Sequence, residues 1–151
     1  MMTNTPSAIK KILVPIDFSP NSIKLLKRAS GTARELGAEL EIIHVVESLA
    51  PYKGLSVPHL PLDDMGRDLV GHAEKKMESF IEENQDSDLP HTTKVISGDD
   101  AATEIIRQAE ESGSDLIIIA SQGFKGLPKF IFGSVAERVL KQAPCPVMTI
   151  K

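Results

Sequence analysis

The strongest constraint on the fold is a short run of residues that is apolar on both of its faces. Residues 115–119 read Asp-Leu-Ile-Ile-Ile and follow a Gly-Ser turn, which is typical of a strand buried on both sides in a parallel sheet. Residues 11–16 form a similar run, and Pro15 near its end cannot donate to a sheet ladder. Both runs are therefore expected to be central strands.

Strand-like and helix-like patterns alternate along the chain. The expected strands are residues 11–16, 39–46, 92–97, 115–119 and 146–150. The expected helices lie between Ser19 and Gly37, over 64–84, after Gly98-Asp-Asp100 through Glu111, and from Ser134 onward. This alternation predicts a single-domain α/β fold, a doubly wound five-stranded parallel sheet that is Rossmann-like, with helices on both faces. Right-handed crossovers favour the strand order 3-2-1-4-5.

Helical spacing also predicts which side chains face the core. In the first helix these are Ile23, Leu26, Ala29, Ala33 and Leu36, and in helix 64–84 they are Met65, Leu69, Ala73, Met77 and Phe80 or Ile81. In the third helix they are Ile105, Ile106 and Ala109, and in the last helix Val135, Val139 and Leu140. His44 lies in an apolar strand and is expected to be a core histidine with a bonded ring nitrogen. Segment 48–63, from Ser48 to Asp63, shows no period, and a cover over a site and a plain loop are equal alternatives for it.

Composition restricts the kind of protein. The 151 residues suit one domain, 1–151, with 1–9 as a flexible tail. Seventeen basic against 21 acidic residues and the absence of Trp disfavour a nucleic-acid binder. The single cysteine, Cys145, excludes an intrachain disulfide and is expected to pack rather than to sense redox state. No stretch resembles a signal peptide or a membrane span, so a cytoplasmic protein without membrane insertion is expected.

Segment 120–134 carries most of the functional signal. Gly123 and Gly126 permit a close approach of the backbone to a ligand, and two lysines add positive charge. The helix that follows begins with Ser134 as the expected N-cap and Glu137 three residues later. Free backbone N–H groups at a helix start bind anions, so a phosphate is expected here, although a capping box alone is also an ordinary helix start. Neither a P-loop nor a Gly-x-Gly-x-x-Gly pattern is present, so a nucleotide site would be of another design.

The expected strand order brings a second segment to the same place. In the order 3-2-1-4-5 the winding reverses between the first and fourth strands, and ligands bind at the carboxyl ends of the strands at such a point. Asp17 directly follows the first strand and is therefore expected beside segment 120–134. A turn before a helix is the alternative role for this aspartate.

These residues resemble the universal stress protein family over essentially the whole chain. The similarity covers Lys-Ile-Leu-Val-Pro-Ile-Asp at 11–17, Ile-His-Val-Val at 43–46, Gly-Ser-Val-Ala-Glu-Arg-Val at 133–139 and Ala-Pro-Cys-Pro-Val at 143–147. ATP-binding members carry the pattern Gly-x2-Gly-x9-Gly-Ser/Thr. Its later positions match Gly123, Gly133 and Ser134, whereas its first position is Ala120 in this chain.

The resemblance implies a set of ATP contacts. Pro15, Asp17 and the backbone of Val45 would hold the adenine and ribose, and Gly123, Gly133, Ser134 and Val135 would hold the phosphates, with Mg or Mn bound through them. No residue is assigned a catalytic role or a direct metal contact. The effect of Ala120 depends on its backbone: with negative φ its methyl group only crowds the ribose, whereas positive φ would cost about 1–2 kcal/mol.

Three functions stay open from the sequence. The first is a dimeric, ATP-binding stress-response regulator that acts on an unknown protein partner. The second is a nucleotide-independent dimeric interaction module, and the third is a slow ATPase, although no P-loop lysine or arginine finger is evident and Arg138 is interpreted as surface charge. The resemblance implies a homodimer through the terminal strand, which begins at Pro146 and ends at Ile150 and has an apolar edge.

Overall fold

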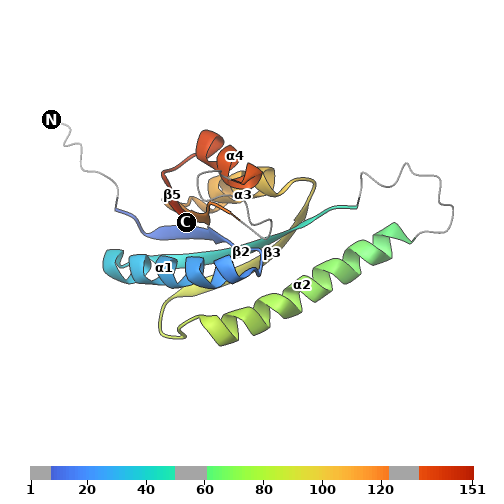
Figure 1. Ribbon diagram of the computed structural model, residues 1–151, viewed down its shortest axis with the longest axis horizontal. Coiled ribbons are helices and arrows are strands. Elements are labelled where there is room, and N and C mark those ends of the chain that lie inside the picture. The colour runs from blue at the N-terminus through green and yellow to red at the C-terminus, as the bar shows by residue number, and fades with distance from the viewer. Residues whose placement is uncertain (1–7, 50–60, 123–132) are drawn as a thin grey trace.

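The computed structural model describes residues 8–49, 61–122 and 133–151 and shows one five-stranded sheet (Figure 1). Its order is β3-β2-β1-β4-β5, and all neighbouring strands pair in parallel. The strands are β1 (Lys11–Pro15), β2 (Glu39–Glu47), β3 (His91–Gly98), β4 (Leu116–Ala120) and β5 (Val147–Ile150). The predicted fold class and strand order are both confirmed, and β5 lies at an edge as expected.

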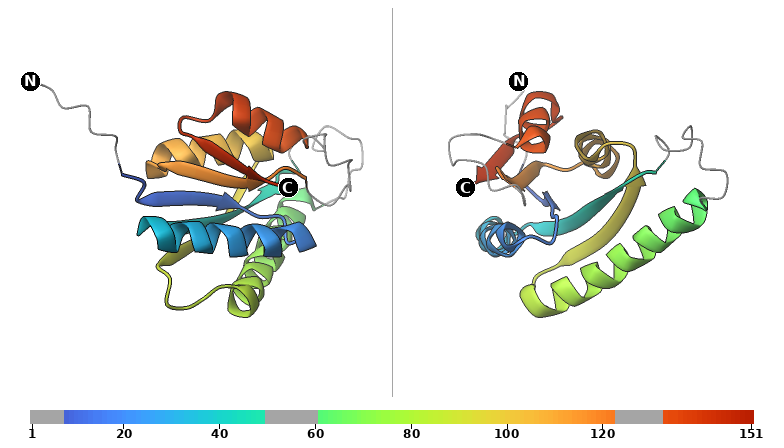
Figure 2. Two further views of the ribbon diagram at one scale, coloured as in Figure 1. Left: turned by 60° about the vertical axis from the view of Figure 1, so that its left-hand side comes forward. Right: turned by 45° about the vertical axis from the view of Figure 1, so that its right-hand side comes forward.

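Four helices cover the two faces of this sheet (Figures 1 and 2). They are α1 (Pro20–Leu36), α2 (Leu62–Asn84), α3 (Ala101–Ser112) and α4 (Ser134–Gln142). Helices α1 and α2 pack on one face, against strand residues such as Ile12 and Ile118, and α3 and α4 pack on the other, against Leu13 and Ile117. Since β1 and β4 send side chains into both clusters, they are buried on both faces, as their uniformly apolar sequences predict.

The ends of α1 and α3 follow the sequence signals. Ser19 is the N-cap of α1 and Pro20 its first residue, where a missing N–H is harmless. Gly37 and Gly113 end α1 and α3 with φ 65° and φ 66°, a conformation that suits glycine. Asp100 caps α3 by accepting a hydrogen bond from the backbone N–H of Thr103 at 3.0 Å.

Five predicted core-facing residues are exposed instead: Ile23 and Leu36 of α1, Met65 and Leu69 of α2, and Leu140 of α4. Met65 and Leu69 are 40% and 44% exposed, and the buried side chains of α2 are Ala73 and Met77. A helix of 23 residues is about 34 Å long, whereas the eight residues of β3 span about 26 Å, so the sheet cannot cover all of α2. Leu140 is also exposed, at 40%, because α4 turns Ala136 and Val139 toward the sheet instead.

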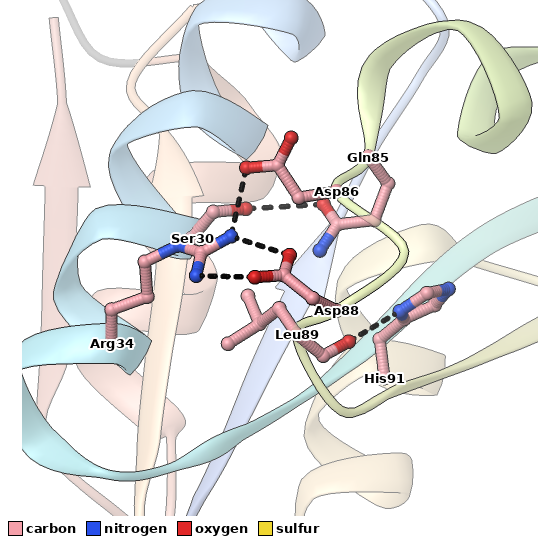
Figure 3. Close-up of polar contacts among 7 residues, drawn as sticks. All are labelled: Ser30, Arg34, Gln85, Asp86, Asp88, Leu89 and His91. Atoms are coloured by element: carbon pink, nitrogen blue, oxygen red, sulfur yellow. Dashed lines mark hydrogen bonds and ion pairs between the residues drawn. The ribbon is translucent and has the colours of Figure 1, made fainter.

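The C-terminal half of α1 is tied to the connection between α2 and β3 (Figure 3). Arg34 donates to the carboxylates of Asp86 and Asp88, at 2.9 Å each, and Ser30 donates to the side-chain oxygen of Gln85 at 3.1 Å. The Arg34 guanidinium lowers the pKa of Asp88 through these hydrogen bonds. These hydrogen bonds lie at the opposite end of α1 from Asp17.

Some predictions fall on other parts of the chain. Residues 50–60 of the predicted loop 48–63, and residues 1–7 of the predicted tail, lie outside the described residues. Ile9 is described and packs against the apolar cluster beneath α1 and α2. None of the helices in the described ranges has the length and hydrophobicity needed to cross a membrane.

Candidate functional site

The carboxyl ends of β1 and β4 lie side by side where the winding of the sheet reverses. The two strands pair through Ile12 with Leu116 and Leu13 with Ile117. From there the chain leaves β1 for α1 on one face, whereas α4, which follows β4, lies on the other face (Figure 2, left). The side-chain amide of Asn21 donates to the carbonyl oxygen of Gln122 at 3.1 Å, which joins the start of α1 to the end of β4. Among the described residues, this bond is what brings the segment after β1 beside the segment after β4.

Asp17 is held firmly in the turn between β1 and α1. Its Oδ1 accepts hydrogen bonds from the backbone N–H of Ser19 and from the hydroxyl of Ser22, both at 2.9 Å. The backbone N–H of Asp17 in turn donates to the Ser22 oxygen at 3.0 Å. The turn role that the sequence left open is thus real, and it fixes the carboxylate at the carboxyl end of β1.

Phe18 has φ 63°, and no other non-glycine residue in the described ranges has a positive φ. A side chain in this conformation costs about 1–2 kcal/mol. The ring is held by packing, since its centroid lies 4.4 Å from that of His44 and 5.7 Å from that of Phe80 in α2. The ring nitrogen Nδ1 of His44 lies 2.7 Å from the carbonyl oxygen of Ile16, which confirms the expected bonded ring nitrogen, although His44 is only half-buried and not part of the buried core.

The backbone of Val45 projects beyond the end of β1. The last pair between β1 and β2 is Pro15 with Ile43, and Ile16 N–H donates to the Ile43 carbonyl at 2.8 Å. Because N–H and C=O groups of a strand alternate in direction, the backbone groups of Val45 point to the same side as those of Ile43. Its side chain packs against the cluster beneath α3 and α4. Val45 therefore offers a backbone edge where β1 no longer pairs with it.

The start of α4 differs in one respect from the prediction. Its N-cap is Gly133, with φ −64° and ψ 155°, and Ser134 is the first helical residue with an exposed side chain. The N-cap assignment of Ser134 is wrong because Gly133 takes that place: its N–H donates to the Ser121 carbonyl at 2.7 Å, and its carbonyl accepts from Glu137 N–H at 3.0 Å. These bonds hold the N–H-rich first turn of α4 against the end of β4.

Ala120 ends β4 with an extended backbone and pairs with Ile150 of β5. It is not among the residues with positive φ, so the unstrained alternative for this position holds. Val135 is half-buried against the cluster beneath α3 and α4. Gly123 and Gly126 lie outside the described residues.

Two residues near this place were not predicted from the sequence to act there. Ser22 is 2% exposed and contacts Asp17 five positions earlier, a spacing that no helical or strand period would indicate. Arg138, interpreted as surface charge, instead donates from α4 to the Asp100 carboxylate and to the Thr103 hydroxyl in α3. The pKa of Asp100 is lowered, first by its hydrogen bonds from Thr103 and then by Arg138. No cluster of three or more metal-binding side chains occurs within the part of the chain that the structure describes.

Comparison with known proteins assigns the family. Residues 8–151 match the Universal stress protein family. The universal stress protein MJ0531 of Methanocaldococcus jannaschii is 33% identical over 153 residues, which cover 100% of this chain and 87% of that protein. The solved structure of MJ0577 from the same organism has a TM-score of 0.79 at 29% identity and covers 96% of this chain and 97% of its own. A structure of an Archaeoglobus fulgidus universal stress protein in complex with dAMP has a TM-score of 0.60 at 21% identity, covering 96% of this chain and 100% of its own. The chain belongs to the universal stress protein family.

Proposed function

We propose that this protein binds ATP between Asp17 and the first turn of α4 and acts as a dimeric stress-response regulator. The observation that carries the proposal is the reversal of winding at β1 and β4, with a fixed carboxylate on one side and a helix N-terminus on the other. Sites of this design take nucleotides in doubly wound folds. The proposal includes Mg or Mn held by the phosphates.

Each end of the nucleotide has suitable groups. The Asp17 carboxylate suits a ribose hydroxyl, and the backbone edge of Val45, two residues beyond the pair of Pro15 with Ile43, suits the polar edge of adenine. Backbone N–H groups at the start of α4, with the Ser134 hydroxyl beside them, suit the phosphates. The role of Gly123 stays an expectation from the family pattern.

The position occupied by Ala120 does not oppose this proposal. Because the residue is in extended backbone, a glycine is not needed there for conformational reasons, and the methyl group adds only local bulk. The dAMP complex of the Archaeoglobus fulgidus protein is a precedent for an adenine nucleotide on this fold. At 21% identity the likeness concerns the fold, so binding by this chain rests on its own residues.

We favour a regulator over an enzyme. Phosphoryl transfer needs a group that positions the attacking water and a cation that stabilises the transition state. Asp17 is already committed to the turn through Oδ1, and Arg138 is paired with Asp100. In the proposed mechanism the nucleotide changes the affinity for an unknown protein partner, the homodimer forms through the edge strand β5, and the protein works in the cytoplasm.

Thermal unfolding with and without ATP and Mg²⁺ tests the proposal. ATP at about one hundred times its dissociation constant should stabilise the fold by about 2.7 kcal/mol and raise the melting temperature by several degrees. Ser134→Glu should abolish this rise, because its carboxylate would repel phosphate, while an acidic side chain in the first turn should itself favour the helix. Ser79→Glu, which adds the same charge at an exposed position in α2, is the control and should keep the rise. An unchanged melting temperature of the wild-type protein in millimolar ATP would refute ATP binding.

A further inference from the structure

The serine at position 22 has an arrangement that an ordinary helix residue does not need. Its side chain is 2% exposed, and its one hydroxyl group makes two hydrogen bonds to the same residue, Asp17. It accepts from the Asp17 backbone N–H at 3.0 Å and donates to Asp17 Oδ1 at 2.9 Å. The two bonds close a ring that fixes both the backbone and the carboxylate of Asp17.

We propose that Ser22 is a positioning residue that aims the Asp17 carboxylate at the ribose of the bound nucleotide. This inference rests on the proposed function. Oδ1 is occupied by two donors, Ser22 and the backbone N–H of Ser19. Among the described residues, no hydrogen bond reaches Oδ2. The carboxylate therefore has one oxygen committed to the turn and the other available to accept a hydrogen bond from a ligand hydroxyl.

The adjacent backbone supports a role beyond starting a helix. Phe18 has a positive φ and lies in the sequence between Asp17 and the two serines that donate to Asp17 Oδ1. Residues with a strained backbone of this kind are frequent at functional sites. The packing of the Phe18 ring on His44 and Phe80 maintains the strained turn. The N-cap residue Ser19, by contrast, makes no side-chain cap, and its buried hydroxyl has no hydrogen-bond partner within the described ranges.

If Ser22 contributed only to folding, different results would be expected. If the ring of bonds only stabilised the start of α1, loss of the Ser22 hydroxyl would lower the melting temperature and leave the nucleotide preference unchanged. If Ser22 aims the carboxylate, its loss should specifically weaken the contribution of the ribose hydroxyl to binding. The ratio of the dissociation constants of 2′-deoxy-ATP and ATP measures that contribution. The ratio of the dissociation constants of AMP and ATP measures the contribution of the β- and γ-phosphates to binding.

The experiment measures these two ratios by titration calorimetry for the wild type, Ser22→Ala and Asp17→Asn. A hydrogen bond to a charged group is worth about tenfold or more in affinity, so the wild type should prefer ATP over 2′-deoxy-ATP by that factor. Ser22→Ala should reduce the preference by at least about threefold while the AMP to ATP ratio stays constant. Ser22→Thr, which retains the hydroxyl, should restore the preference.

The control is Ser30→Ala. Ser30 is also a buried serine of α1, but its hydroxyl bonds to Gln85 at the far end of the helix. This variant should match the wild type in both ratios, whatever it does to stability. Amide hydrogen exchange at Asp17 in the nucleotide-free protein adds a readout without ligand, and it should quicken in Ser22→Ala and not in Ser30→Ala.

The outcomes separate this inference from the proposed function. A wild type that binds no nucleotide would overturn both. A wild type that binds ATP, with Ser22→Ala showing the same preference or unchanged exchange at Asp17, would overturn the positioning role alone.

Discussion

The ring of Phe18 lies 4.4 Å from the ring of His44, centroid to centroid, while the backbone of Phe18 is in the left-handed region at φ 63°. The favourable ring contact and the unfavourable backbone occur in one residue. The preceding residue, Asp17, carries its side-chain carboxylate just after the last residue of β1. Packing among these partly buried rings therefore maintains the turn that presents this carboxylate.

Two substitutions separate the contact from the strain. Phe18→Ala removes the ring but keeps a β-carbon at positive φ, whereas Phe18→Gly removes both. We expect both variants to be less stable than the wild type, with Phe18→Gly the more stable of the two by about 1 kcal/mol. Urea denaturation measures this order. The control is the exposed helical position Ser79, where the order should reverse: Ser79→Gly should be less stable than Ser79→Ala. If the glycine variant were the less stable one at position 18 as well, the backbone of Phe18 would not be strained.

The stability of the fold should depend on the protonation of Asp100, which accepts hydrogen bonds first from Thr103 at the start of α3 and then from Arg138 in α4. The pKa of Asp100 is lowered in the fold, so its stabilisation is complete above the unfolded value of about 3.9 and is lost as the pH falls through the folded value. Asp100→Asn keeps a cap acceptor but loses the charge, and it should destabilise by less than about 1 kcal/mol at neutral pH because the pair is half-exposed. Denaturation from pH 7 to pH 2 should show this difference shrinking toward zero, and a constant difference would contradict the assignment.

Gly98 at the end of β3 has no room for a side chain. A β-carbon there would lie 2.3 Å from Cγ of Glu104, which is 7% exposed and pairs with Arg107. Gly98→Ala should destabilise the protein by about 1–3 kcal/mol, because the buried Glu104 has to move. In the Glu104→Ala background the same change should cost much less. Gly71→Ala in α2, where a β-carbon meets nothing within 4 Å, should stabilise the fold, and equal effects at both glycines would count against the close contact.

Cys145 should react slowly with thiol reagents in the folded protein. Burial, followed by the charge of Asp115, raises the pKa of its thiol, so less thiolate is present near neutral pH. We expect alkylation by iodoacetamide to be slower at pH 7 than in the unfolded chain, and to accelerate with pH up to a higher midpoint. A rate as fast as that of the unfolded chain at pH 7 would show that Cys145 is an activated thiol.

Much of the architecture follows from local patterns. The uniformly apolar runs that became β1 and β4 identify the central strands, and Pro20 and Gly37 mark the two ends of α1. The strand order then follows from the handedness of the crossovers, and it places the start of α1 beside the end of β4, where Asn21 bonds to Gln122.

The errors have physical causes that local patterns do not contain. Met65 and Leu69 continue the apolar stripe of α2, but exposure depends on how far the sheet extends beneath the helix. Gly133 and Ser134 are both acceptable N-cap residues, and the bond from Gly133 to Ser121 decides between them. Ser22 and Arg138 contact residues that only the folded chain brings near, so their partners were not evident.

Equilibrium dialysis with labelled ATP and Mg²⁺ tests the central claim most directly. We predict saturation at one nucleotide per chain, with binding sharply weakened by Asp17→Ala and by Ser134→Glu and unchanged by Ser79→Glu. Bound ATP that stays far below one per chain at millimolar free nucleotide would contradict the account. Saturable binding that is equally strong in the wild type, Asp17→Ala and Ser134→Glu would also contradict it.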